Sequence, residues 1–565
     1  VPGLVGLRPF TLVEYQGAPV ALTVQAVGFA EGGTIYALLV WADRDEAVRR
    51  ESQMRTAALG IEITGAEEVS LQGAAPRKLT PSLLAEVDAY VGATMEHFGI
   101  PGAAYAVVQD GQIIHAEGFG VRALGHPEPV TPETMMLVAS VTKPMTTTYM
   151  ATIVDDGSMR WDTPVVDVLP SFAVADPAVT PSLIMSDLVC ACTGVPKRDL
   201  ELAFESDGVT ARETIASLRD FTFFTPVGEA YQYSNQMAAA GGYITAIAGG
   251  GSLDTAHADY VRDMEQSIFG PIGMADTTFS LAAVQDRGNY AMPHTLALDG
   301  SVTPFPLTLE ADVDVVAPAG GAWSTVADLG RFVITQLQRG RTPDGTRVVT
   351  EANLNETWTP RVQIAPDISY GLGWIVTDYK QQPLLYHTGG TLGYNAEVAF
   401  LPEAGLGVAI VINQSNMLAF AEAVRNRVFE LAFEQPPAGD AAIAFASEQQ
   451  QQALAELRGM IQPLDENAVT AFLGTWAHPL LGTVTLTLDD GRLVADAGEI
   501  ASQLLAARDA STGKTFYVTA TPPVIGLRIS LRDNPGPRSL IVYDPASTET
   551  YVFAPVAEAT ATPTG

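Results

Sequence analysis

Ser140 and Lys143 are the two residues of this chain whose types and spacing could most directly do chemistry. They lie three residues apart in Ser140-Val141-Thr142-Lys143, and residues three apart on a helix share one face. A serine hydroxyl attacks a carbonyl carbon only when a neighbouring base takes its proton, and a lysine amine can be that base or activate one. The pair therefore predicts a nucleophilic serine that is activated without a histidine.

The same four-residue pattern occurs again at Ser511, and the surrounding sequence separates the two copies. Small and apolar residues precede Ser140 and a helical pattern follows it, with Pro144 where the first turn of a helix tolerates proline. Ser511 lies in a glycine-containing stretch before the strand-like residues 515–519, which predicts a hairpin turn. Residues three apart in a strand do not face each other, so only the pattern at Ser140 predicts a nucleophile.

Tyr233-Ser234-Asn235, farther along the chain, adds a phenol and an amide to the candidate site. The phenol of a tyrosine has a reference pKa near 10, and an ammonium about 4 Å away would favour the phenolate by roughly 4 kcal/mol. Tyr233 could therefore be the base, activated by Lys143. In the alternative, neutral Lys143 is the base and Tyr233 passes the proton to the leaving group. The Asn235 amide could hold the acyl side chain of a substrate or orient Lys143.

A third motif, His387-Thr388-Gly389-Gly390, completes a pattern that a known family shares. With Ser-x-x-Lys first, Tyr-x-Asn second and Lys/His-Thr/Ser-Gly third, the chain resembles the serine β-lactamases and penicillin-binding-protein-like hydrolases. It is most similar to the branch with class C β-lactamases, D-alanyl-D-alanine carboxypeptidases, D-aminopeptidases and family VIII carboxylesterases. The resemblance covers roughly residues 79 to 435 and includes supporting stretches at 271–279, 318–325 and 370–374.

The resemblance implies a role for each motif residue. A covalent acyl-enzyme would form on the serine, and two backbone N–H groups would stabilise the oxyanion, each typically by about 3 kcal/mol. Glycines at the third motif would let the backbone approach the substrate closely. The implied site consists of catalytic Ser140, Lys143, Tyr233 and His387, oxyanion-hole donors Ser140 and Gly390, and substrate-binding Asn235, Thr388 and Gly389.

His387 departs from the lysine that many relatives carry at this position. A histidine lacks the permanent cation that would hold a substrate carboxylate, so the substitution favours esterases, D-amino-acid peptidases and carboxypeptidases over β-lactamases. In the alternative, His387 only hydrogen-bonds the edge of a strand. The other histidines are scattered along the chain, and no metal-binding motif is present, so no metal and no cofactor is expected.

Cys190 and Cys192 are the only cysteines of the chain, and they replace a histidine-threonine-serine-glycine loop usual in relatives. Cysteines this close form disulfides rarely, because the geometry requires strain. We therefore expect two small buried thiols under the active site. A reversible disulfide is the alternative.

Composition limits the classes of partner. With 31 basic and 64 acidic residues the net charge is -33, which argues against nucleic acid and anionic membrane surfaces. No apolar stretch is long enough to span a membrane. The chain begins at Val1 rather than at methionine, and this start together with the resemblance predicts an exported protein, periplasmic or extracellular.

The sequence pattern predicts an α+β multidomain chain. The resemblance implies an antiparallel sheet flanked by helices with an all-helical insertion, and alternating strands near the C-terminus predict a small lipocalin-like β-barrel that could narrow access to the site. The predicted units are an N-terminal α+β unit at 1–78, with strands at 11–15, 20–29 and 34–40, the hydrolase domain at 79–436, a linker helix at 437–464, the barrel at 465–557 and a disordered tail at 558–565.

Together these observations predict a serine hydrolase that cleaves an ester or amide through an acyl-enzyme on Ser140. Short-chain esters and D-amino-acid peptides are the expected substrates, and β-lactams are expected to react more slowly. Alternatives are a slow-deacylating penicillin-binding protein and a non-catalytic protein that binds peptidoglycan fragments or peptides. An α/β-hydrolase is disfavoured because no Gly-x-Ser-x-Gly motif is present.

Overall fold

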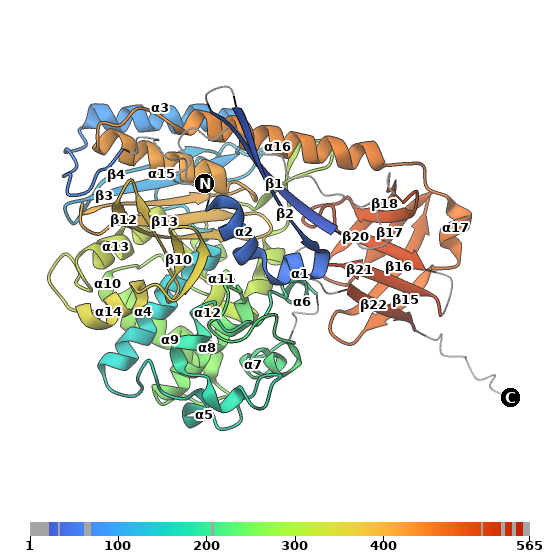
Figure 1. The fold of residues 1–565 in the computed structure, drawn as a ribbon, viewed down its shortest axis with the longest axis horizontal. Helices are drawn as coiled ribbons and strands as arrows, with labels where there is room; N and C mark the ends of the chain where they lie inside the picture. Colours follow the sequence, from blue (N-terminus) through green and yellow to red (C-terminus); the bar gives the residue numbers. More distant parts are fainter. Residues whose placement is uncertain are drawn as a thin grey trace.

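The structure, a computed structural model, describes residues 22–31, 34–60, 69–204, 208–509, 512–532, 537–544 and 550–556. The predicted strand at 11–15, the hairpin turn at Ser511 and the tail at 558–565 lie outside these residues. Figure 1 shows a large unit of sheet and helices, a long helix that runs from it, and a barrel beside it. Within the described residues, no helix combines the length and apolar character that a membrane crossing needs.

An eight-stranded antiparallel sheet forms the centre of the large unit, in the order β4-β3-β14-β13-β12-β11-β10-β9. Every residue of β3, β13 and β14 is buried, because these strands are apolar runs covered by helices on both faces. Strand β3 from the start of the unit pairs with β14 from its end. The helical insertion lies between these two strands in the sequence. The strands are β3 (Gly102–Gln109), β4 (Gln112–Gly120), β9 (Val362–Ala365), β10 (Ile368–Tyr370), β11 (Ile375–Tyr379), β12 (Gln382–Gly390), β13 (Asn395–Leu401) and β14 (Leu406–Ile412).

Helices cover the two faces of this sheet and form separate cores with it. On one face α3 (Pro81–Phe98) and α15 (Leu418–Ala432) pack through apolar residues such as Val91 and Phe429. On the other face α13 (Val326–Leu337) packs against β3 and β14, and its core continues into the helical insertion. The predicted β-lactamase-like fold is therefore confirmed.

The helical insertion contains the helix that follows Ser140. Its main helices are α4 (Thr142–Asp155), α8 (Asn235–Ala248) and α9 (Ala256–Met264). The remaining short elements are β5 (Met136–Leu137), β6 (His294–Leu296), β7 (Val302–Pro304), β8 (Trp323–Ser324), α5 (Val165–Val168), α6 (Leu200–Ala203), α7 (Ala211–Ser217), α10 (Gly270–Ile272), α11 (Leu281–Arg287), α12 (Ala317–Gly320), α14 (Glu351–Trp358), η1 (Ala139–Val141), η2 (Thr180–Ser182), η3 (Met185–Leu188), η4 (Leu218–Asp220), η5 (Glu265–Phe269) and η6 (Leu307–Val316).

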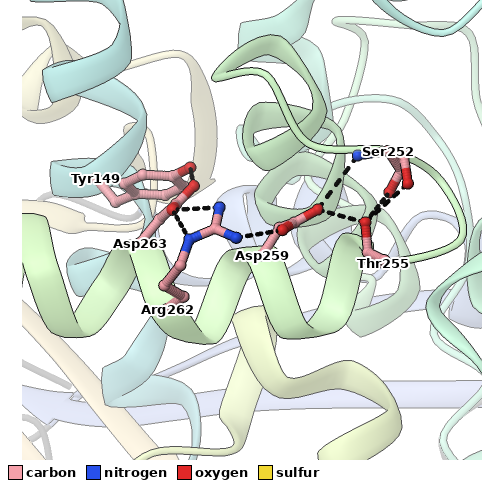
Figure 2. A network of polar contacts seen from close by, with 6 residues as sticks. All are labelled: Tyr149, Ser252, Thr255, Asp259, Arg262 and Asp263. Carbon is pink, nitrogen blue, oxygen red and sulfur yellow. Dashed lines mark hydrogen bonds and ion pairs between the residues drawn. The ribbon is translucent and has the colours of Figure 1, made fainter.

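A polar network ties α9 to α4 (Figure 2). The guanidinium of Arg262 donates to Asp259 at 2.5 Å and to Asp263 at 2.8 Å, both on its own helix. Asp263 also accepts a 2.8 Å hydrogen bond from the hydroxyl of Tyr149 on α4. At the other end, Thr255 donates to Asp259 at 2.6 Å. The network therefore fixes the position of α4 from outside the site.

The first described residues, 22–31 and 34–59, form two paired strands followed by two helices. Strand β1 (Leu22–Glu31) pairs with β2 (Thr34–Asp43), and the helices are α1 (Arg44–Arg49) and α2 (Glu51–Leu59). The carboxylate of Asp43 caps α1 by accepting from the N–H of Glu46 at 2.9 Å. Helix α2 packs against β9 at the edge of the central sheet.

The C-terminal residues form a closed eight-stranded antiparallel barrel, which confirms the predicted barrel. Helix α16 (Gly439–Met460) packs on α15 and connects the large unit to the barrel. Helix α17 (Glu466–Thr470) precedes the first barrel strand. Apolar residues such as Trp476 and Phe553 alternate along the strands and fill the interior. The strands are β15 (Gly474–His478), β16 (Gly482–Asp489), β17 (Arg492–Asp496), β18 (Ala501–Arg508), β19 (Thr515–Thr519), β20 (Arg528–Arg532), β21 (Ser539–Tyr543) and β22 (Thr550–Pro555).

Candidate active site

Ser140 lies on η1, a single tight turn that leads directly into α4. Ala139 before it has a φ of 50°, a left-handed conformation that alanine adopts only when its surroundings hold it there. Thr142 Oγ1 donates to the carbonyl oxygen of Ala139 at 2.7 Å and accepts from the N–H of Ala322 at 3.2 Å. These bonds fix the turn, so that the half-buried Ser140 is presented at the start of the helix, where the sequence predicts it.

The amine of Lys143 is surrounded by three oxygen atoms. Its Nζ lies 3.0 Å from Ser140 Oγ, 2.7 Å from Asn235 Oδ1 and 2.7 Å from the carbonyl oxygen of Ala319. The amide and carbonyl oxygens can only accept hydrogen bonds, so two N–H groups of the amine point at them. In the neutral amine the remaining position is a lone pair, and it faces the hydroxyl of Ser140.

Burial favours this neutral form. The lysine is only 4% exposed, and desolvation lowers the pKa of Lys143 to about 7. The charge of Asp199 acts in the opposite direction and that of Lys197 in the same direction, but both are smaller than the effect of burial. Lys143 therefore exchanges its proton near neutral pH.

Tyr233 reaches the same serine from the start of α8. Its hydroxyl lies 2.8 Å from Ser140 Oγ, and the Nζ of Lys143 lies 4.6 Å from the centre of its ring. Burial raises the pKa of Tyr233 well above its usual value, so the phenol keeps its proton. Of the two alternatives derived from the sequence, the one in which Lys143 is the base and Tyr233 a proton carrier fits this geometry. A phenolate produced by the lysine charge does not, because the amine lies over the ring face.

Asn235 connects Lys143 to a carboxylate. While its Oδ1 accepts from the lysine, its Nδ2 donates to Asp199 Oδ1 at 2.9 Å. The second oxygen of Asp199 forms an ion pair with Lys197 at 3.1 Å. Asn235 therefore orients Lys143, which is one of the two roles that the sequence left open.

The third motif forms the end of β12 and lies beside the Ser140 turn. A Cβ on Gly389 would lie 2.1 Å from the carbonyl oxygen of Val138, so only glycine allows this close approach. Gly390 pairs with Asn395 on β13, and Thr388 pairs with Glu397. The end of β12 thus lies beside the Ser140 turn. This is the arrangement expected if the backbone N–H groups of Ser140 and Gly390 form the oxyanion hole, as the family resemblance implies.

The hydrogen-bond partners of His387 are a backbone carbonyl and a tyrosine hydroxyl. Its Nδ1 lies 2.7 Å from the carbonyl oxygen of Thr388, and its Nε2 lies 2.9 Å from the hydroxyl of Tyr370. Because a carbonyl only accepts, Nδ1 carries the proton and Nε2 accepts from the phenol. Burial lowers the pKa of His387 to about 3, so the ring is uncharged. Its ring is 6.5 Å from that of Tyr233, and its catalytic role stays a prediction.

Cys190 and Cys192 form a disulfide, so the expectation of two free thiols was wrong. The physical reason lies in the residue between them: Ala191 has a φ of 51°, which turns the chain so that the two Cα atoms are 5.1 Å apart. The same residue accepts a 2.8 Å backbone hydrogen bond from the N–H of Gln232, directly before Tyr233. Among the described residues, Asp187 and these two cysteines are the one group compact enough to hold a metal, and the disulfide occupies both sulfurs.

The N-terminal helices contact the segment that carries Tyr233. The carbonyl oxygen of Arg49 accepts from Gln232 Nε2 at 2.7 Å, and Arg50 forms an ion pair with Glu229. The guanidinium of Arg49 also lies 5.9 Å from the ring of Phe224. Residues from the first 60 positions therefore support the segment that leads to Tyr233.

Sequence reasoning missed three contributors to the site: Asp199, the carbonyl of Ala319, and Tyr370. The last two lie in stretches that supported the family resemblance, but neither has a side chain or spacing that indicates a contact with Lys143 or His387. A signal for Asp199 existed, since its ion-pair partner Lys197 is one of only five lysines in the chain.

Comparisons with known proteins identify the family of the chain. The family model described as Beta-lactamase matches residues 87–433. The chain is 28% identical over 338 residues to the unguisins hydrolase ungD' of Aspergillus campestris, covering 57% of this chain and 60% of that protein. It is 29% identical over 347 residues to penicillin-binding protein 4 of Amycolatopsis lactamdurans, covering 60% and 87%. The D-alanyl-D-alanine-carboxypeptidase/endopeptidase AmpH of Escherichia coli is 22% identical over 372 residues, covering 62% and 90%.

The fold also has a solved counterpart. The octameric penicillin-binding protein homologue from Pyrococcus abyssi superposes with a TM-score of 0.55 at 18% identity, covering 83% of this chain and 99% of that one. At this identity the likeness concerns the fold alone. Its coverage exceeds that of the sequence matches, which span about 60% of this chain.

Proposed function

The chain belongs to the beta-lactamase family of serine hydrolases, and on that premise we propose that it hydrolyses an ester or amide through an acyl-enzyme on Ser140. The observation that carries the proposal is the arrangement of three oxygens around Lys143. Two of them, from Asn235 and Ala319, take both hydrogens of the neutral amine and leave its lone pair for the serine hydroxyl.

The acylation step follows from these contacts. Lys143 takes the hydroxyl proton as Ser140 Oγ bonds to the substrate carbonyl carbon, and the carbonyl electrons move to the oxygen at the oxyanion hole. When the tetrahedral intermediate collapses, the bond to the leaving group breaks. Tyr233 donates its proton to that group and regains one from the Lys143 ammonium, which returns the amine to neutrality. Water then attacks the acyl-enzyme with the same groups in reversed roles.

Two observations support esters and D-amino-acid peptides as the substrate class. His387 is uncharged at neutral pH, so the end of β12 does not supply a cation for a substrate carboxylate. Among the relatives, the Escherichia coli protein is named a D-alanyl-D-alanine-carboxypeptidase/endopeptidase, and the Aspergillus protein an unguisins hydrolase. Within this class, esters and internal peptide bonds suit the neutral histidine best, whereas a carboxypeptidase substrate needs another group to bind the carboxylate beside its scissile bond.

Slow deacylation is the second candidate, because one relative is named a penicillin-binding protein. In that case Ser140 acylates rapidly and water attack limits turnover. A burst of product equal to the enzyme concentration, followed by little turnover, distinguishes it from a hydrolase.

The deciding experiment is labelling with a fluorophosphonate probe, followed by intact-mass measurement and peptide mapping. We expect one adduct on Ser140 in the wild type and none in Ser140→Ala. Short-chain esters, D-amino-acid peptides and a chromogenic β-lactam are then compared by kcat/KM. A folded wild-type protein that acquires no adduct contradicts the proposal and favours a binding protein. An adduct on another serine contradicts the assignment of the nucleophile.

We also propose that the protein works in an oxidising compartment outside the cytoplasm. The disulfide between Cys190 and Cys192 supports this, since structural disulfides are rare where thiols are kept reduced. Alkylation of the freshly isolated protein without reductant should leave its mass unchanged. Two added alkyl groups would contradict the proposal.

A further inference from the structure

A short segment, residues 197–204, lies between the catalytic lysine and the C-terminal barrel. We call it the 197–204 segment; it begins with Lys197 and Arg198, continues through Asp199 and includes α6. One end contacts the site and the other end contacts the barrel. The sequence gives no sign of this double contact, because the barrel strands follow more than 260 residues later.

On the side of the site, Asp199 fixes the orientation of the Asn235 amide. A carboxylate can only accept, so Nδ2 of Asn235 must face Asp199 and Oδ1 must face Lys143. The reversed amide would place N–H groups against the lysine amine and turn its lone pair away from Ser140. Asp199 therefore selects the one amide orientation in which the amine can act as a base.

Asp199 also sets the charge that Lys143 experiences. Four ionisable side chains face the amine: Asp199, Lys197, Tyr233 and His387. Tyr233 and His387 are uncharged at neutral pH, so Asp199 and Lys197 are the charged residues of this group that act on Lys143. Lys197 forms an ion pair with Asp199, and the charges of Asp199, Asp544 of the barrel and Glu51 of α2 raise the pKa of its amine.

On the other side, the segment packs against the barrel. Leu200 and Phe204 pack against the apolar core of the barrel, a cluster that includes Trp476, Tyr551 and Phe553. The hydroxyl of Tyr551 donates to Glu201 at 3.2 Å, and Glu201 forms a buried ion pair with Arg198. The barrel thus contributes both apolar and polar contacts to the residues on either side of Asp199.

From these contacts we infer that Asp199 is a positioning residue for Lys143 and that the C-terminal barrel holds it in place. The barrel then acts on the chemistry itself, through Asp199 and Asn235, in addition to any effect on access. The inference rests on the proposed function, because it concerns the base that activates Ser140.

The test is the pH dependence of fluorophosphonate labelling of Ser140 in the full chain, with a pair of charge variants. Asp199→Asn removes a negative charge near Lys143, so the midpoint of the acidic limb should move down by on the order of half a pH unit. Lys197→Gln removes a positive charge, so the midpoint should move up by a similar amount. Asp199→Ala, which also frees the amide, should lower the plateau rate by about tenfold or more. Loss of structure alone does not move the midpoint in opposite directions.

The role of the barrel is tested with matched tyrosine variants. Tyr551→Phe removes the hydrogen bond to Glu201, whereas Tyr517→Phe alters another tyrosine of the same barrel core. We expect Tyr551→Phe to lower the plateau rate severalfold and Tyr517→Phe to leave it within twofold. Phe204→Ala should lower it further, and neither Phe204→Ala nor Tyr551→Phe should add its full effect to Asp199→Ala.

The outcomes separate the two proposals. A wild-type protein that is not labelled at Ser140 at any pH contradicts the proposed function. Labelling with identical midpoints in wild type, Asp199→Asn and Lys197→Gln contradicts the positioning role alone. Equal rates for Tyr551→Phe and Tyr517→Phe contradict the part played by the barrel.

Discussion

Two cations, Lys143 on α4 and Arg262 on α9, show opposite ways to hold a positive charge. Arg262, on the outer face, donates directly to Asp259 and Asp263, and its side chain is 50% exposed (Figure 2). These hydrogen bonds raise its pKa, so its charge is permanent. Lys143 is 4% exposed, touches only neutral oxygens, and has its nearest carboxylate beyond the Asn235 amide.

The difference teaches what separates a structural cation from a catalytic base. A carboxylate in direct contact fixes the proton on its partner, whereas an intervening amide passes on only part of that stabilisation. Burial then lowers the pKa of Lys143 to about 7. Burial and an amide that keeps Asp199 out of direct contact therefore act together to leave an amine near Ser140 that exchanges its proton.

The largest effect is expected when the amine of Lys143 is removed. Lys143→Met should slow labelling of Ser140 by about a thousandfold, because the hydroxyl loses its base. Its thermal midpoint should change little, since removal of the cost of burying an amine offsets the loss of its hydrogen bonds to Asn235 and Ala319. Lys380→Met, at a lysine outside the site, is the control and should label at the wild-type rate. A loss of less than tenfold in Lys143→Met would assign the base to another group.

The comparison is sharpened by moving the carboxylate into direct contact. In the swap variant Asn235→Asp/Asp199→Asn the same two groups exchange positions, so composition and charge are unchanged. The carboxylate then faces Lys143 as those of Asp259 and Asp263 face Arg262, and it should raise the pKa of the amine by at least one unit. Labelling at pH 7 should fall by about tenfold and recover by pH 9. A loss that is the same at every pH would contradict this electrostatic account.

The wild-type protein supplies the reference curve. Because the base is the neutral amine, labelling should be slow when Lys143 is protonated, rise through about pH 7 and level off above it. Below the midpoint the rate should change about tenfold per pH unit. A curve that falls from pH 6 to pH 8 would mean that a protonated group limits acylation.

The smallest effect is expected on the side of the permanent cation. Tyr149→Phe removes the hydrogen bond to Asp263 and should lower the stability of the helical insertion by about 1 kcal/mol. The midpoint of the labelling curve should stay where it is, because the network lies outside the site. Urea unfolding and the pH profile check the two statements separately. A shifted midpoint would show that α4 transmits changes from its outer face to Ser140.

The sequence predicted the parts of the site that repeat as local patterns. Ser140 and Lys143 share a helix turn, and the order of the three motifs indicated the fold that brings Tyr233 and Asn235 to them. The barrel was predictable because its strands alternate between apolar and polar residues.

Contacts that depend on irregular backbone were not predictable. The disulfide forms because Ala191 has a positive φ, a conformation that an alanine in the sequence does not indicate. Ala319 contributes a carbonyl, which every residue has, and Asp199 contacts Asn235 from a segment whose Leu200 and Phe204 pack against the distant barrel. Such contacts arise from tertiary packing between distant segments, which no local pattern records.

The contact between the 197–204 segment and the barrel has a consequence during synthesis. Ribosomes release a chain from its N-terminus, and the barrel strand that holds Tyr551 is the last described strand to emerge. Asp199 is therefore made long before the surface that holds it. A nascent chain that has completed its sheet and its three motifs still lacks this support for Lys143. The hydrolase should reach full reactivity only after the strands of the barrel have emerged and paired, so that the barrel sets the time at which the serine becomes active.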